Sequence, residues 1–132
     1  MKKILLLSCI ILLSSVMAQA ACNGIPIKSG KYCMSKHMMN WYSAYAWCHA
    51  QGMQMVDVKS DCVSLSSCPA LKLTQEDYKA MKDAGYNGNN STTGAWTNTS
   101  ETAAVAYFIN MDQGVIYNYF SRNSANRVAV CK

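Results

Sequence analysis

The stretch NWYSAYAWCHAQGM, residues 40–53, places a cysteine beside a histidine within a group of aromatic side chains. Cys48 would be a nucleophile if His49 or His37 served as its base. Cys33 and Cys48 together with the two histidines would instead supply four ligands for zinc. Both chemistries need free thiols, so the redox state of the cysteines decides between them and a structural role.

The N-terminus predicts the compartment in which these thiols lie. Two lysines precede an apolar run over residues 4–16, and residues 18–20 (Ala-Gln-Ala) have the small-x-small pattern of a signal-peptidase site. The run is too short to span a membrane comfortably. We therefore expect residues 1–20 to be a cleaved signal peptide, residues 21–132 to be a single domain, and no stable membrane insertion after cleavage.

A lipoprotein signal with Cys22 as the lipidated residue is the alternative. Gln19 stands where such sites prefer an aliphatic residue, which disfavours it. The short basic start and the Leu/Ile-rich run are typical of bacterial signals. The expected location is therefore the periplasm, the bacterial cell surface or the medium.

Six cysteines remain after the signal, at positions 22, 33, 48, 62, 68 and 131. An even number in a small exported chain is typical of three disulfides, with fifteen pairings possible. Thiolates compete poorly with disulfide formation in an oxidising compartment, so we expect neither a Cys48 nucleophile nor a metal site. No cofactor is expected either.

Charge argues against one class of partner. Lys2 and Lys3 leave with the signal, so the twelve basic residues fall to ten against seven acidic ones, a net charge of +3. No basic run exceeds two residues, so we do not expect nucleic acid as a partner.

Two helices are predicted by their end signals. Asn40 is a good N-cap for a helix that Gly52 can end, and MQMVDV, residues 53–58, then reads as a strand. In LTQEDYKAMKDAG, Thr74 can cap a second helix, with Asp77 in a capping-box position, and Gly85 can end it.

The C-terminal third predicts strands. AVAYFIN, GVIYNY and RVAVC are short and rich in β-branched and aromatic residues, and Asp112-Gln113-Gly114 is a predicted hairpin turn. The order of elements is hairpin, helix, strand, helix and then several strands. The expected fold class is α+β, with helices packed against short antiparallel sheets.

Several segments occur in an order that resembles a known family. CNGIPIKSGKYC brackets the hairpin with cysteines, and MNWYSAYAWCHAQGMQMV carries Trp41, Ala44, Cys48, Gly52 and Val56 at family spacing. AWTNTSE, AYFINMDQGVIYNYF and NRVAVC follow. From Cys22 to Cys131 the chain resembles a C-type-lectin-like domain of the compact bacterial kind. This resemblance implies the disulfides Cys22–Cys33, Cys48–Cys131 and Cys62–Cys68, with Cys48 structural. From its place on the helix we also expect Trp41 to be in the core.

The chain departs from the family in the residues that bind calcium and sugar. That site uses Glu-Pro-Asn or Gln-Pro-Asp and a later Trp-Asn-Asp, whereas neither Pro26 nor Pro69 is flanked in this way and Trp96 begins Trp-Thr-Asn. A hard cation needs several oxygen ligands on one loop system. We therefore expect no calcium-dependent sugar binding. No titratable residues show a catalytic spacing, so we do not expect an enzyme.

The remaining interpretation is a binding module. The segment VIYNYFSRNSANRV combines tyrosine, asparagine, serine and arginine, the residue mix of antibody-like binding surfaces, although a solvated loop between strands is equally compatible. The leading hypothesis is a secreted or surface module that recognises a protein or cell-surface ligand without calcium. A structural envelope or pilus-associated component is the alternative, and a calcium-independent glycan binder is the third. The candidate ligand-binding residues are Trp96, Tyr117, Asn118, Tyr119, Arg122 and Asn123.

Overall fold

A computed structural model describes residues 21–86, 93–100 and 102–132, and the side chains of these residues except Asn118 and Tyr119. The predicted signal peptide lies outside the described residues. The strands are β1 (Ile25–Ile27), β2 (Tyr32–Met39), β3 (Gly94–Ser100), β4 (Val105–Asn110), β5 (Val115–Ser121) and β6 (Arg127–Cys131). The helices are α2 (Trp41–Ala50), α3 (Val58–Asp61), the 3₁₀ turn η1 (Pro69–Leu71) and α4 (Gln75–Asp83).

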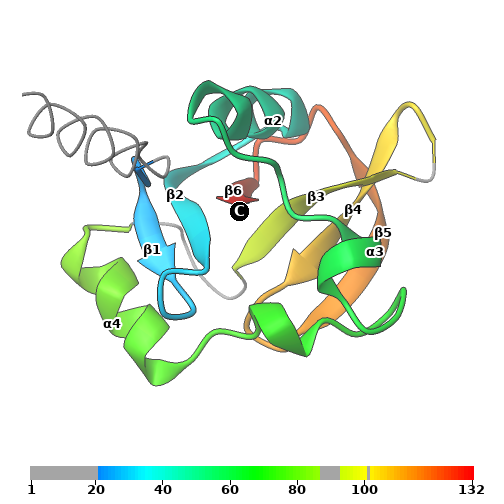
Figure 1. The fold of residues 1–132 in the computed structure, drawn as a ribbon. Coiled ribbons are helices and arrows are strands. Elements are labelled where there is room, and N and C mark those ends of the chain that lie inside the picture. The colour runs from blue at the N-terminus through cyan, green and yellow to red at the C-terminus, as the bar shows by residue number, and fades with distance from the viewer. Residues whose placement is uncertain (1–20, 87–92, 101) are drawn as a thin grey trace, which may run out of the picture.

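The six strands form one sheet in the order β1-β2-β6-β3-β4-β5. β6 and β3 pair in parallel at Val128 and Ala95, and the other neighbouring pairs are antiparallel. The α+β class is confirmed, whereas the separate antiparallel sheets that we expected are joined into one mixed sheet by this parallel contact. In Figure 1, α2 crosses the top of the view and α4 lies beside β1, while α3 contacts β3.

Both faces of the sheet are buried, because successive side chains of a strand point to opposite faces. In β6, Val128 and Val130 belong to a core packed with residues of α4, η1 and α3, whereas Ala129 and Cys131 belong to a second core with residues of α2. This explains why residues 128–131, VAVC, form an uninterrupted apolar run rather than an alternating one.

Helix α2 begins and ends where its sequence predicts. The Asn40 side chain accepts a hydrogen bond from the backbone N–H of Ser43, and Gly52 has a φ of 72° just beyond the helix. That left-handed conformation suits a glycine. Ala44 and Cys48 are the buried residues of α2, so the helix contacts the sheet through one narrow face.

Helix α4 has the predicted capping box. Thr74 Oγ1 accepts from the Asp77 N–H, and the Asp77 carboxylate accepts from the Thr74 N–H. The same carboxylate accepts from the Lys28 N–H at 2.7 Å, which ties the β1–β2 turn to the start of α4. Gly85, with a φ of 78°, follows the end of the helix as predicted.

The predicted strand over residues 53–58 is wrong. Met55 makes only an isolated bridge to Cys131, and Val58 already begins α3. This segment fits between the diverging ends of β6 and β3, since the Val56 N–H donates to Val130 O and the Asn98 N–H donates to Val56 O. The wedge is too short for a regular strand, because the Asp57 side chain caps α3 directly after it.

The structure has the three disulfides that the resemblance implied, Cys22–Cys33, Cys48–Cys131 and Cys62–Cys68. Cys48–Cys131 joins α2 to the last strand across 83 positions of sequence. The predicted turn at residues 112–114 is also present, with the Gly114 N–H donating to Asn110 O at 2.8 Å. Among the described residues, no helix has the length and apolar character needed to cross a membrane.

Candidate functional site

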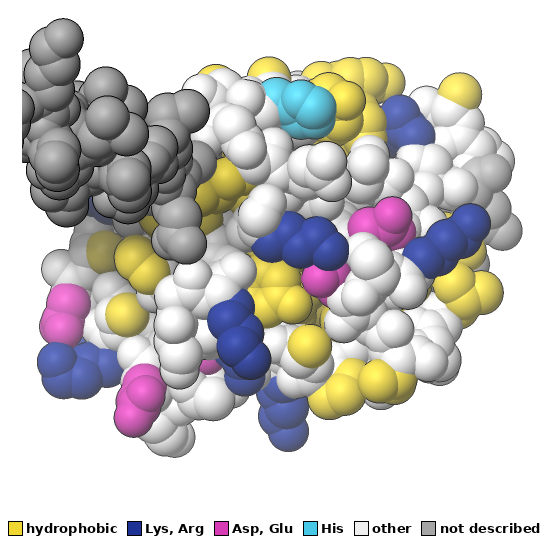
Figure 2. Space-filling model, in the orientation of Figure 1, with side chains coloured by type: hydrophobic (Ala, Val, Ile, Leu, Met, Phe, Trp, Pro, Cys, Tyr) yellow, Lys and Arg dark blue, Asp and Glu magenta, His cyan; other side chains and the backbone are white. Residues whose placement is uncertain are grey.

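Three ring side chains form a stack on the outer side of α2. Trp41, Tyr45 and His49 are four residues apart, so the helix places them one after another along its surface. The Trp41 and Tyr45 rings are stacked with centroids 5.3 Å apart, and the Tyr45 and His49 rings with centroids 4.2 Å apart. Figure 2 shows a histidine beside hydrophobic side chains along the top of the molecule, over α2.

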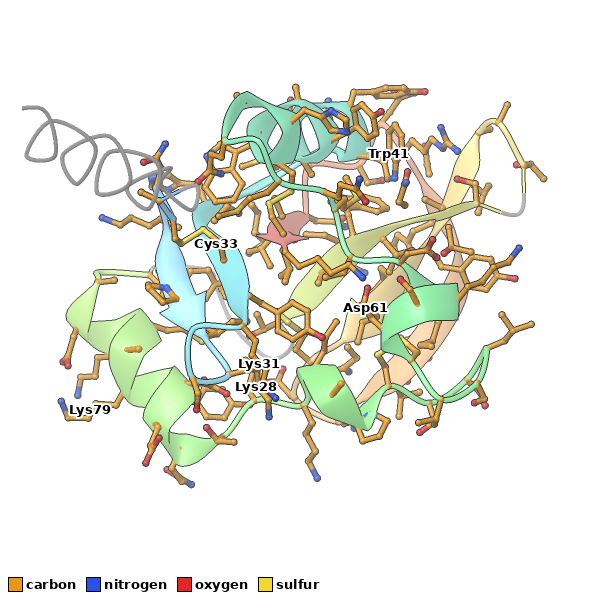
Figure 3. The ribbon with its side chains drawn as sticks, viewed as in Figure 1. Lys28, Lys31, Cys33, Trp41, Asp61 and Lys79 are labelled. Carbon is orange, nitrogen blue, oxygen red and sulfur yellow. A yellow bond between two sulfur atoms is a disulfide. The ribbon has the colours of Figure 1, made fainter. Side chains whose placement is uncertain are left out.

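Arg122, in the turn between β5 and β6, extends this stack. Its Cζ lies 4.2 Å from the centroid of the Trp41 ring, a cation–π contact. Its Nη2 donates to Ser100 Oγ and, at 3.4 Å, to Thr102 O. Figure 3 places Trp41 at the start of α2, beside the connection that carries Arg122. We call Arg122, Trp41, Tyr45 and His49 the α2 stack.

The α2 stack is anchored to the sheet at its Trp41 end. Trp41 Nε1 donates to Thr97 O at 2.9 Å, and the Trp41 backbone N–H donates to Arg122 O at 3.0 Å. Tyr45 remains 37% exposed, and neighbouring Tyr42 is 50% exposed with its ring edge-on to Trp41. The stack therefore presents tyrosine side chains to solvent from a fixed base.

A second aromatic group surrounds Arg127 at the start of β6. Its Cζ lies 4.0 Å from the centroid of the Phe108 ring and 4.4 Å from that of Phe120. These two rings meet edge-on, and Tyr117 stacks on Phe108 with centroids 5.2 Å apart. Burial lowers the pKa of the Arg127 guanidinium from its ordinary value. We call Arg127, Phe108, Phe120 and Tyr117 the Arg127 box.

Trp96 must be removed from the predicted ligand-binding residues. It is 0% exposed, packs in the core between the sheet and α2, and donates from Nε1 to Met39 O at 2.8 Å. A ligand cannot reach a side chain in that position. Trp96 is buried because β3 is an interior strand of the sheet rather than an edge strand.

The other predicted residues lie on β5 and in the turn that follows it. Tyr117 is half-buried in the Arg127 box, Arg122 is in the α2 stack, and Asn123 is exposed. The side chains of Asn118 and Tyr119 lie outside the described residues. The structure thus divides this predicted binding segment between two aromatic groups, and whether its residues bind a ligand stays a prediction.

Sequence reasoning missed the surface that α2 presents. Tyr45 and His49 follow Trp41 at intervals of four, a spacing visible in the sequence that we did not interpret as a surface. Trp41, which we expected in the core, is only partly buried and packs against it. Arg127 was missed as well, because no local signal predicts that it folds back over Phe108. Its neighbours in the box come from β4 and β5, so only strand pairing brings them together.

Two cavities have charged side chains in their walls. The larger, of about 560 Å³, is walled by the β1–β2 turn and the start of α4, including Lys28, Lys31, Glu76 and Asp77. Burial would raise the pKa of Asp77, but hydrogen bonds from Lys28 and Thr74 outweigh it and lower that pKa. Both carboxylate oxygens of Asp77 thus accept structural hydrogen bonds.

The smaller cavity, of about 380 Å³, lies between α3 and the end of β3. A hydrogen bond from Thr99 lowers the pKa of Asp57, the carboxylate in its wall, although burial opposes the shift. Asp57 also accepts from the Lys59 N–H as the cap of α3. Its carboxylate is therefore committed to structure in the same way as that of Asp77.

The thiol and metal chemistries considered for residues 40–53 find no support in the geometry. Cys33 and Cys48 are both in disulfides, so neither offers a thiol or a thiolate ligand. Within residues 21–86, 93–100 and 102–132, His, Cys, Asp and Glu side chains form no group of three or more that could hold a metal ion. The stretch is a helix whose Cys48 side is structural and whose Tyr45 side faces solvent.

No protein-family model matches the chain, and no curated protein matches its sequence.

Proposed function

We propose that this protein is a binding module with a C-type-lectin-like domain, exported from a bacterial cell, that recognises a protein ligand without calcium. The observation that carries the proposal is the α2 stack. Tyrosine, tryptophan and arginine are the residue types that concentrate binding energy in protein interfaces. Here they are gathered on one solvent-facing surface and anchored to the sheet.

The arrangement of the rings favours a protein over a sugar. Sugars bind aromatic side chains through the open face of a ring. Trp41 lies between Arg122 and Tyr45, and Tyr45 lies between Trp41 and His49, so these faces are already covered. Ring edges and the hydroxyls of Tyr42 and Tyr45 remain, and these suit the mixed apolar and polar contacts of a protein surface.

The α2 stack is held in place before a ligand binds, and this favours tight binding. Ordering a free side chain on binding costs about 0.5–1.5 kcal/mol. Tyr45 is stacked on both sides before any ligand arrives, so little of that cost remains for it. The three disulfides support export, because such bonds persist in oxidising compartments.

The test is capture of partner proteins from bacterial surface extracts in the presence of a calcium chelator. We expect the wild-type domain to capture a protein that Tyr45→Ala binds about 30-fold more weakly, which corresponds to ~2 kcal/mol for an interface hot spot. Tyr78→Ala is the matched control, because Tyr78 has nearly the same exposure, 38%, but lies on α4. Thermal unfolding of each variant checks that the fold is retained.

Three outcomes would contradict the proposal. Equal capture by Tyr45→Ala and wild type would show that the α2 stack is not the binding surface. Binding to a glycan array without capture of any protein would favour the glycan-binding alternative. Assembly of the domain into envelope or pilus material without loss in Tyr45→Ala would favour the structural one.

A further inference from the structure

The Arg127 box holds a cation in an unusual setting. The guanidinium lies against two phenyl rings, and its Nε is buried without a hydrogen-bond partner among the described atoms. Nη1 donates to Asn126 O at 2.8 Å. A guanidinium has five N–H donors in a planar fork, so most of the outer edge formed by Nη1 and Nη2 is left for another acceptor.

Gly94, beside the Arg127 box, indicates that the sequence is suited to this placement of the Arg127 side chain. A Cβ added at Gly94 would lie 2.2 Å from Arg127 Cδ and 2.7 Å from Nε, so only glycine lets the side chain lie flat on β3. Gly94 is the first residue of β3, and a glycine in a strand often marks a place where another group approaches the backbone closely. The group that approaches Gly94 is the side chain of Arg127.

The chain itself supplies no counter-ion for this cation within its described part. Six of the seven acidic residues are described, and the ion pairs that they form are with Lys79 and Lys132. Aromatic faces attract a cation but do not neutralise it. Arginine recognises carboxylates through two parallel N–H···O bonds. These bonds use the outer edge of the guanidinium, most of which is free in Arg127.

We propose that Arg127 is a binding site for a single carboxylate, supplied by an acidic side chain of the protein ligand. The carboxylate accepts from Nη1 and Nη2 of Arg127, with Phe108 and Phe120 holding the guanidinium plane. One guanidinium matches the single charge of a carboxylate, whereas a phosphate dianion needs further donors that the box lacks among its described residues. That the carboxylate belongs to a protein rests on the proposed function.

The experiment titrates the folded domain with N-acetyl-glutamate α-amide, which has one carboxylate, while following the side-chain Nε–H signal of Arg127 by ¹H–¹⁵N NMR. The Nε–H signal that is missing from the spectrum of Arg127→Lys is assigned to Arg127. Arg122 is the internal control, because its Nε is also buried without a partner and its guanidinium also lies over a ring. The neutral N-acetyl-glutamine α-amide and methyl phosphate are the comparison probes.

We expect a saturable shift of the Arg127 signal with the glutamate probe, none with the glutamine probe, and binding of methyl phosphate at least threefold weaker. The absence of a saturable shift, an equal shift with the neutral probe, or an equal shift at Arg122 would overturn the site. Methyl phosphate binding as tightly as the glutamate probe would overturn its assignment to a carboxylate.

This titration needs no protein partner, so its result is independent of the capture experiment on Tyr45. A saturable shift without protein capture would retain the carboxylate site and refute the proposed function. Protein capture that depends on Tyr45, without a shift of the Arg127 signal, would support the proposed function and refute the carboxylate site.

Discussion

Removing the disulfides one at a time should destabilise the domain in an order set by the length of chain that each closes. Cys48–Cys131 spans 83 positions of sequence, whereas Cys62–Cys68 spans 6. The perturbation is a pair of double variants, Cys48→Ala/Cys131→Ala and Cys62→Ala/Cys68→Ala. Each removes both sulfur atoms, so no free thiol is left to form a different bond.

The magnitude follows from the entropy that a cross-link removes from the unfolded chain. For a loop of 83 positions the chain-entropy relation gives ~4.5 kcal/mol of stability. For a loop of 6 positions the same relation gives ~2.2 kcal/mol. Loop length alone therefore gives a difference of about 2 kcal/mol. Cys48 and Cys131 are both 0% exposed, whereas Cys62 is only partly buried, so lost packing adds to this difference rather than reducing it.

The assay is urea unfolding without reductant, followed by far-UV circular dichroism and extrapolated linearly to water. We expect the free energy of unfolding to fall by about 2 kcal/mol more when Cys48–Cys131 is removed than when Cys62–Cys68 is removed. An equal loss, or a greater loss for the short loop, would refute the reasoning. In that case local packing around each bridge, rather than loop length, would determine its contribution.

Two further predictions concern stability. Trp96→Ala should lower the free energy of unfolding by about 3–5 kcal/mol, the cost of truncating a buried large aromatic, and an unfolding midpoint within error of wild type would contradict its core position. Asp77 has a lowered pKa in the folded state, so its contribution is present above its unfolded pKa of about 3.9 and is lost as the pH falls through the folded value. Urea unfolding at pH 5 and pH 2.5 should therefore show a smaller acid-induced loss of stability in Asp77→Asn than in wild type, and identical losses would show that Asp77 does not link folding to pH.

Features that depend on a few neighbouring residues were predicted from the sequence. The Asn40 cap, the Thr74–Asp77 capping box and the glycine after α4 are confirmed. Each is a backbone hydrogen bond or a backbone conformation set within one helical turn. The three disulfides were predicted only by resemblance, because the spacing of cysteines alone leaves fifteen pairings open.

Exposure of the aromatic residues could not be predicted in this way. Trp96 reads as part of a polar, surface-like segment, yet β3 is an interior strand and its tryptophan is buried. Trp41 was expected in the core, yet it is only partly buried, and α2 buries only Ala44 and Cys48. Which face of a strand or helix is covered depends on the elements packed against it, and these come from distant parts of the chain.

The sequence by itself determined the α+β class, the ends of the two longer helices and the turn at residues 112–114, because these follow from short-range hydrogen bonding and from the period of apolar residues. Only the tertiary structure decided that residues 54–56 form a wedge between β6 and β3, and that Arg127 lies over Phe108 and Phe120. The physical reason is that both depend on the register between strands far apart in sequence. That register is fixed because both faces of the sheet must be buried at once. No short segment of the sequence is enough to predict this burial.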